Sequence, residues 1–326
     1  MKRNNRDESG ESKQIAGDGI DRRNFLQCMA WAGTGLVWSM VAGVPTSKLL
    51  ADTKGSSPVK TGKVEDFSFV QISDSHIGFN KAANQNVTGT LQKTIEKINT
   101  PGMKQPDFMI HTGDITQNSK PTEFDTAVQV IKGAKAGQVF YVPGEHDFAL
   151  DDGEQYKQRF GKGTLGNGWY SHNYKGVHFV GLNNVVQVDS MGNLGADQLA
   201  WLKADLCDLS SSTPVVVFAH IPLWMVYEKW GWGTQDGATA LAYLKRFGSV
   251  TVLNGHIHQV VQKVEGNVSF HTAMSTAFPQ PAPGAAPGPG PMAVPAGKLE
   301  SVLGVTDVKV VRGHTHLAVI DSTLAV

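Results

Sequence analysis

Five short apolar runs in this chain each lead into a small group of acidic residues, histidines or glycines. The first run, at 67–72, leads to Asp74 and His76, and the second leads to Gly113 and Asp114. Polar side chains that follow successive strands meet at one edge of an α/β sheet, where loops present them to a shared site. The pattern therefore predicts an α/β fold with one centre for chemistry.

The three later groups have the same position after an apolar run. They are Gly144-Glu145-His146-Asp147, then His220, and finally Gly255-His256-Ile257-His258. In the first and last of the five groups, two candidate ligands are separated by one residue. Along an extended chain this spacing points both side chains to the same side, so one metal ion could bind both Asp74 and His76. Gly113 lets the backbone turn sharply before Asp114, which leaves that carboxylate free to bridge two cations.

Between these groups, short apolar runs alternate with helix-like segments, as expected for layered sheets covered by helices. The predicted strands are 67–72, 107–111, 138–142, 177–182, 214–218, 250–253, 260–264, 268–272, 308–312 and 317–321. The predicted helices are 85–98, 121–134, 154–160, 196–209 and 238–247. Residues 279–297 form a charge-free run rich in proline, alanine and glycine, which predicts an extended loop.

The amino-terminal region, 1–51, resembles a twin-arginine (Tat) export signal. Arg22 and Arg23 are followed by Phe25 and Leu26, and then by an uncharged, moderately apolar stretch that ends at Ser47. This signal predicts the Tat export machinery as a partner, a periplasmic location, and no stable membrane association after removal of the signal. An uncleaved membrane anchor is the alternative, because the stretch approaches the roughly 20 residues that span a bilayer.

Residues 52–63 are a linker in this interpretation, and 64–326 form the folded domain. The whole chain has 29 basic and 29 acidic residues, so it has no overall field to attract nucleic acid polymers or anionic lipid. Any specificity for anions must therefore be local. Of the two cysteines, Cys28 lies inside the signal region, which leaves Cys207 without an internal partner for a disulfide.

The ordered set D-x-H, G-D, G-E-H-D, H and G-H-x-H resembles the pattern of the calcineurin-like metallophosphoesterase superfamily. The resemblance extends from about residue 67 to 258 and includes the run Gln-Leu-Ala-Trp-Leu at 198–202. It implies a four-layer α/β/β/α sandwich of two mixed sheets flanked by helices, the metallo-dependent phosphatase fold. It also implies two metal ions, Fe, Mn or Zn, because imidazole and carboxylate ligands suit these cations. By the same resemblance, one ion would be held by Asp74, His76 and His258, the other by Glu145, His220 and His256, with Asp114 bridging both.

Glu145 departs from the family pattern, which usually has asparagine at this position. A carboxylate in place of a neutral amide raises the number of anionic ligands from two to three. The added charge should tighten metal binding and raise the pKa of bound water, and a trivalent iron in one site would offset it. The alternative is that Glu145 turns away and the second metal is weak or lost.

His146 is similar to the family's histidine beside the metals, which stabilises the transition state or protonates the leaving oxygen. Asp147 is expected to orient its imidazole. The resemblance implies a hydrolase that cuts phosphomonoester or phosphodiester bonds of small molecules with metal-activated hydroxide. Two alternatives remain, a metal-binding scaffold on the same fold without turnover and an exported nucleotide-binding module.

Other candidates lie outside this set. His314 and His316 form a second G-H-x-H, which we expect to be less suited to the metal role than His256 and His258 because a proline-rich run separates it from His220. His111 could reach the site or pack beside it. Aromatic residues after the His220 turn could stack a flat group or form a small core of their own; these are Trp224, Tyr227, Trp230 and Trp232. Purple acid phosphatases have tyrosine three residues after the bridging aspartate, and this chain has Gln117 there, so no tyrosinate-to-iron colour is expected.

Overall fold

The computed structural model describes residues 36–41, 44–49, 63–101, 104–185, 191–314 and 316–325. The chain divides into two units, Met1–Ser57 and Pro58–Val326. In the first unit, strands β1 (Leu36–Val41) and β2 (Val44–Leu49) pair antiparallel. The twin-arginine motif lies outside the described residues. No helix in the part of the chain that the structure describes is both long and apolar enough to cross a bilayer.

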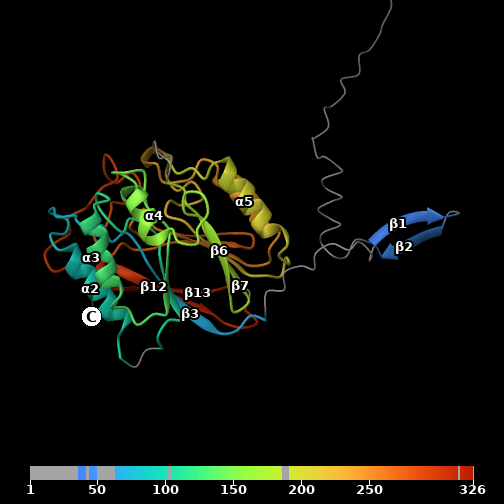
Figure 1. Cartoon of the computed structure of the whole chain (residues 1–326), viewed down its shortest axis with the longest axis horizontal. Coiled ribbons are helices and arrows are strands. Elements are labelled where there is room, and N and C mark those ends of the chain that lie inside the picture. The colour runs from blue at the N-terminus through green and yellow to red at the C-terminus, as the bar shows by residue number, and fades with distance from the viewer. Residues whose placement is uncertain are drawn as a thin grey trace, which may run out of the picture. The chain divides into compact units, whose positions relative to one another are not determined.

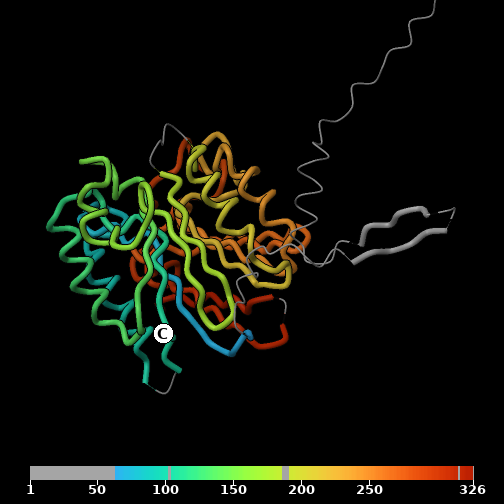
Figure 2. Tube along the Cα trace, turned by 45° about the vertical axis from the view of Figure 1, so that its right-hand side comes forward, coloured from blue at the N-terminus to red at the C-terminus, as the bar shows by residue number. Residues whose placement is uncertain are grey.

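The second unit contains two mixed sheets. The five-stranded sheet has the order β13-β12-β3-β4-β5, in which β3, β4 and β5 are parallel and β12 and β13 are antiparallel to their neighbours. Its strands are β3 (Phe67–Ile72), β4 (Phe108–His111), β5 (Gln138–Tyr141), β12 (Gly304–Val310) and β13 (Ala318–Thr323). Figure 2 shows the red carboxyl-terminal strands beside the blue β3, as the pairing of β12 with β3 requires.

The six-stranded sheet has the order β10-β11-β9-β8-β7-β6. Its four central strands are parallel, and the two edge strands, β10 and β6, run antiparallel to their neighbours. Its strands are β6 (Tyr170–Tyr174), β7 (Val177–Gly181), β8 (Val215–Phe218), β9 (Val250–Asn254), β10 (Gln262–Glu265) and β11 (Val268–Thr272). The buried strands β7, β8 and β9 consist mainly of β-branched and aromatic residues, which suit a sheet covered on both faces.

Three apolar cores separate four layers. The middle core joins the two sheets through stacked and edge-on aromatic rings, such as Phe69 and Phe108 with centroids 4.9 Å apart and Phe108 and Phe179 with centroids 5.3 Å apart. A second core packs helices α2 (Val87–Ile98) and α3 (Pro121–Ile131) on the outer face of β3 and β4. Figure 1 shows these helices on one side of the molecule and α5 on the other.

The third core packs α5 (Ala196–Cys207) and α6 (Gly237–Leu244) on the outer face of β7, β8 and β9. A shorter helix, α4 (Glu154–Phe160), contributes Tyr156 to the core beneath α2 and α3. The order helix, sheet, sheet, helix confirms the predicted four-layer α/β/β/α sandwich.

The predicted strands and helices are all present, with ends that differ by a few residues. Strands β1 and β2 of the first unit were not predicted. In the second unit one strand, β6, was not predicted, because its sequence Tyr-Ser-His-Asn-Tyr mixes polar and aromatic residues without a run of aliphatic ones. It forms through pairing with β7 at the sheet edge. β12 begins at Gly304 rather than at residue 308, because pairing with β13 extends it over a glycine and Asp307. Residues 279–297 form neither helix nor strand, as predicted.

Candidate metal centre

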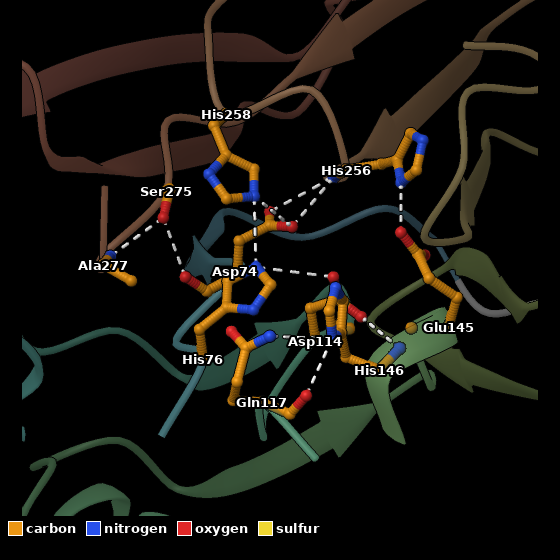
Figure 3. Close-up of polar contacts among 12 residues, drawn as sticks. Asp74, His76, Asp114, Gln117, Glu145, His146, His256, His258, Ser275 and Ala277 are labelled. Atoms are coloured by element: carbon orange, nitrogen blue, oxygen red, sulfur yellow. Dashed lines mark hydrogen bonds and ion pairs between the residues drawn. The ribbon is translucent and has the colours of Figure 1, made fainter. Parts of the chain in front are cut away.

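The seven predicted metal ligands lie together at the carboxyl ends of five parallel strands. β3 leads to Asp74 and His76, and β4 leads to Asp114. β5 leads to Glu145 at the start of a short 3-10 helix, Glu145–Asp147, while β8 and β9 lead to the three other histidines. Figure 3 shows the side chains of these ligands other than His220, which come from both sheets and point toward one another. The topology therefore brings together residues that are far apart in the sequence.

Five of these residues have an unusual backbone conformation. Positive φ angles occur at Asp74 (54°), His76 (42°), Asp114 (52°), His256 (71°) and His258 (55°). This region is sparsely populated by residues other than glycine, and such residues gather at functional sites where the surrounding structure holds them. Two backbone hydrogen bonds, from Asp74 N to Gly113 O (3.0 Å) and from His76 N to Asp114 O (2.9 Å), hold the first two loops against each other.

Two glycines allow the loops to approach this closely. A β-carbon at Gly144 would collide with the carboxylate and backbone nitrogen of Asp114, and one at Gly255 would collide with the hydroxyl of Ser73. Neither glycine needs a positive φ, so close approach and not backbone freedom explains them.

The first group of ligands consists of Asp74, His76 and His258, and all three are buried. Nε2 of His258 lies 3.3 Å from Oδ1 of Asp74 and 3.2 Å from Nε2 of His76. Each residue offers one ligand atom, and these atoms lie within 4.8 Å of one another. The group has the composition and size of a site for one metal ion.

The second group consists of Glu145, His220 and His256, which also lie within 4.8 Å of one another. Oε2 of Glu145 is 2.9 Å from Nε2 of His220, and Oε1 is 2.9 Å from Nδ1 of His256. The Glu145 side chain therefore points toward the group and does not turn away. Asp114 lies between the two groups, because its Oδ2 is 3.4 Å from His76 and 3.5 Å from His220.

The hydrogen-bonding state of the histidines fits bound cations. Nδ1 of His220 donates to the Thr112 carbonyl (2.7 Å), so Nε2 of the neutral ring carries a lone pair toward the Glu145 carboxylate. Nε2 of His220, Nδ1 of His256 and Oε2 of Glu145 are buried without a hydrogen bond. Electron-rich atoms this close need a positive charge between them, which either a proton or a metal ion can supply.

The charges around His220 point the same way. Burial lowers its pKa, but the carboxylates of Asp114 and Glu145 outweigh burial and hold the pKa well above its usual value. Burial raises the pKa of Glu145, but the imidazoles of His256 and His220 hold it well below its usual range. A proton held this strongly between the groups marks a position that favours positive charge.

His146 lies beside the first group, with its ring centroid 4.9 Å from that of His76. One of its ring nitrogens is also within 4.8 Å of the ligand atoms of His76 and Asp114. Nδ1 of His146 donates to the Gln117 carbonyl (2.8 Å), and the Gln117 side-chain amide lies 3.2 Å from the same nitrogen. Gln117 therefore fixes the orientation of this ring, and Nε2 stays available for chemistry.

The expectation that Asp147 orients His146 is wrong. The buried Asp147 carboxylate accepts hydrogen bonds from the backbone N–H groups of Ile115, Thr116 and Gly144 and from the Thr116 hydroxyl, at 2.9–3.1 Å. Asp147 therefore holds the loop after β4 to the loop after β5. Its sequence position next to His146 suggested otherwise, but the short 3-10 helix turns the two side chains to different partners.

The other candidates take different places. His314 is exposed on the turn between β12 and β13 together with His316, and neither belongs to a ligand group among the described residues. Burial lowers the pKa of His111 to about 4, and the neutral ring donates from Nε2 to the Ser75 hydroxyl (2.8 Å). His111 thus supports the first loop. Among the four aromatic residues after His220, Trp224 and Trp232 are buried, whereas Tyr227 and Trp230 are half-buried.

Sequence reasoning missed one set of residues at the centre. Ser275 and Phe278 lie in the irregular segment after β11, and both contact the first ligand group. No charged or metal-binding side chain marks this segment, so only the fold could reveal it.

Comparison with known proteins agrees with this geometry. The profile of the family described as "Calcineurin-like phosphoesterase" matches residues 67–260, which is more than half of the chain. The chain belongs to the calcineurin-like phosphoesterase family. The matched residues of this phosphoesterase include all seven candidate ligands.

Two curated relatives each align with nearly two thirds of this chain. A probable glycerophosphodiester phosphodiesterase from Arcobacter nitrofigilis is 27% identical over 223 residues, which cover 63% of this chain and 77% of the relative. A probable cyclic nucleotide phosphodiesterase from Vesicomyosocius okutanii is 24% identical over 217 residues, which cover 65% of this chain and 87% of the relative.

Two solved structures share the fold of this phosphoesterase. A dimetal phosphatase from Danio rerio aligns with a TM-score of 0.54 and 14% identity, covering 79% of this chain and 99% of that one. A purple acid phosphatase from yellow lupin aligns with a TM-score of 0.57 and 12% identity, covering 82% of this chain and 53% of that one.

Proposed function

We propose that this protein is a dimetal hydrolase of small-molecule phosphoesters, with Asp74, His76 and His258 at one ion and Glu145, His220 and His256 at the other. Asp114 would bridge the two. The single observation that carries the proposal is the meeting of these side chains in two adjacent groups that share the Asp114 carboxylate. When bound, the cations would activate water and neutralise charge on the phosphoryl oxygens.

The residues of the chain have separate tasks in this proposal. The ligand loops hold the two groups at fixed separation, because backbone hydrogen bonds and the Asp147 carboxylate tie them together. His146 lies beside the first group with its Nδ1 held by the Gln117 carbonyl. Its Nε2 would donate a proton to the leaving oxygen of the substrate, so that the leaving group departs as a neutral alcohol.

We favour phosphodiesters over phosphomonoesters as substrates. Both relatives above are described as phosphodiesterases, one of glycerophosphodiesters and one of cyclic nucleotides. The mixed imidazole and carboxylate donors suit Fe, Mn or Zn, and the carboxylate of Glu145 would favour a more highly charged ion in the second site. Thiolate donors are absent from the ligand groups found in the described residues.

We further propose that the protein is exported to the periplasm by the Tat machinery, as the Arg22-Arg23 motif suggests. The alternative of an uncleaved anchor gives a different readout, because an anchored protein sediments with membranes after cell lysis. Export of a folded domain is compatible with a metal centre loaded beforehand.

The proposed function is tested with aryl phosphate monoesters and diesters, assayed after separate addition of Mn, Fe and Zn. Wild type is compared with Asp114→Asn and with Asp208→Asn, which makes the same change on an exposed residue at the end of α5. We expect Asp114→Asn to lower kcat/KM by roughly 10²–10⁴-fold, since it removes the shared anionic ligand, and Asp208→Asn to retain activity. Equal activity of wild type and Asp114→Asn would refute the dimetal proposal.

A further inference from the structure

The segment 275–280 follows β11 and lies outside the residues that the family profile matches. We infer that this segment positions the first metal ion, and that Ser275 is its principal positioning residue. The inference rests on the proposed dimetal function and adds residues to it that no sequence motif of the chain marks. It follows from three sets of contacts, at Ser275, Phe278 and Thr276.

Ser275 holds the backbone of a candidate ligand. Its buried hydroxyl donates to the carbonyl oxygen of Asp74 (2.8 Å) and accepts from the N–H groups of Ala277 (2.8 Å) and Phe278 (3.2 Å). Figure 3 shows the Ser275 hydroxyl between Ala277 and the Asp74 backbone. Because Asp74 has a left-handed backbone conformation, a hydrogen bond to its carbonyl opposes relaxation of the loop. Loss of the hydroxyl should therefore move or loosen the Asp74 carboxylate.

Phe278 holds the two histidines of the same group. Its carbonyl oxygen accepts from Nδ1 of His258 (2.6 Å), which fixes the tautomer that leaves Nε2 free for a cation. Its ring centroid lies 4.8 Å from the ring centroids of both His76 and His258. The Phe278 ring is buried, so it restricts rotation of both imidazoles by packing.

Thr276 ties the segment to the same loop a second time. Its N–H donates to the Ser73 carbonyl (3.0 Å), and its hydroxyl donates to the Ser75 hydroxyl (3.1 Å). At the end of the segment, the Gln280 side-chain amide donates to the His256 carbonyl (3.2 Å). The segment thus contacts all three members of the first group, but it contacts only one member of the second. Its effect should be larger at the first metal ion than at the second.

Metal binding tests this inference without any measurement of turnover. Protein freed of metal by chelation is titrated with Mn²⁺ by calorimetry, and the two binding steps are assigned with Asp74→Asn and Glu145→Gln. We expect Ser275→Ala to weaken the Asp74-dependent step about tenfold or more, as for other residues that orient metal ligands. The Glu145-dependent step should change by no more than about twofold.

Matched variants separate positioning from general support of the fold. Ser275→Thr keeps the hydroxyl and should restore the Asp74-dependent step, whereas Ser301→Ala removes an exposed hydroxyl bonded to the Lys298 carbonyl and should change neither step. Phe278→Leu keeps the carbonyl acceptor and removes the ring, so it gives a second test if Ser275→Ala does not fold. We expect it to weaken the same step selectively.

The inference is overturned if Ser275→Ala and Phe278→Leu leave both steps unchanged, or if they weaken both steps equally. These results would leave the dimetal proposal intact, because wild type would still bind two ions. If wild-type protein bound no Mn²⁺, Fe²⁺ or Zn²⁺, the proposed function itself would fail, and the positioning role with it.

Discussion

Oε2 of Glu145 lies 2.9 Å from Nε2 of His220, and both atoms are buried without a hydrogen bond. Nδ1 of the same imidazole is occupied by the Thr112 carbonyl, so this contact cannot be relieved by a change of tautomer. The pair is therefore arranged for a shared positive charge. It also places a carboxylate where the family usually has a neutral amide, which makes Glu145 the residue most informative about the second ion.

Glu145→Asn should weaken binding of the second metal ion and leave binding of the first unchanged. Removal of one unit charge about 4 Å from a cation costs on the order of 1–4 kcal/mol per unit of ion charge at dielectric constants of 80 to 20, which lowers affinity by roughly 5- to 1,000-fold for each unit of ion charge. Metal content of purified protein and a Mn²⁺ titration measure the effect. Glu154→Gln, on an exposed part of α4, is the control for loss of a carboxylate. Tighter binding of the second ion by the Asn variant would show that the carboxylate does not ligate it.

His146→Ala should lower kcat by about 10²–10⁴-fold with metal content unchanged, because it removes the proton donor and not a ligand. The loss should be greatest for alkyl esters, whose leaving oxygens need a proton, and smallest for nitrophenyl esters. A series of diesters with leaving groups of different pKa measures this dependence. An equal loss for all leaving groups, or loss of one metal ion, would instead place His146 among the ligands.

The free energy of unfolding should fall less on acidification in His172→Phe than in wild type. The His172 ring lies between Phe140 (centroids 4.0 Å apart) and Phe179 (5.1 Å), and burial lowers its pKa to about 4 from a usual 6.5. Because the folded pKa is the lower one, this histidine contributes its full stability above pH 6.5 and loses it as the pH falls toward 4.

The difference can be measured by urea denaturation of metal-free protein at pH 7.5 and 5.0. Between these pH values, the free energy of unfolding of wild type should fall by on the order of 1–2 kcal/mol more than that of His172→Phe. His314→Gln, a change at an exposed histidine, should lose as much as wild type. The interpretation is wrong if His172→Phe and wild type lose stability to the same extent.

Replacement of Arg22 and Arg23 by lysine should abolish export of a reporter fused after residue 60. The twin-arginine pathway recognises the arginine pair specifically, whereas lysines preserve the charge that a general secretory signal or membrane anchor requires. Cell fractionation gives the location of the reporter. Unchanged delivery to the periplasm would contradict the Tat assignment, and recovery in the membrane pellet would favour the anchor.

The sequence predicted the fold and the ligand clusters well for a physical reason. Strand-forming runs such as 67–72 and the polar turns that follow them are local signals, and the parallel arrangement of strands then brings the turns together. The placement of Asp74 and His258 in one group came from the resemblance to the family, because these residues follow strands of two different sheets. The spacing of two residues in D-x-H agrees with two ligands in one group, whereas His256 and His258 of H-x-H lie in different groups. The backbone at these positions is left-handed and not extended, so the alternation of an extended chain does not apply to them.

The supporting residues could not be predicted in this way. Asp147 follows His146 directly, yet its carboxylate bonds to backbone N–H groups of another loop, and this depends on the path of a short 3-10 helix. Ser275 resembles any other serine in the sequence, because its role comes from a contact with a residue far along the chain. Strand β6 escaped prediction because its neighbour, not its own composition, makes it a strand.

The pairing of β12 with β3 has a consequence for the order of events during synthesis. β3 carries the loop with Asp74 and His76, but one of its two neighbours is made only after nearly the whole chain has been translated. The earlier strands can emerge from the ribosome during translation, yet this sheet stays incomplete until residues 304–310 have emerged as well. Assembly of a site with high metal affinity should therefore be largely post-translational, and nascent chains stalled before β12 should capture metal poorly.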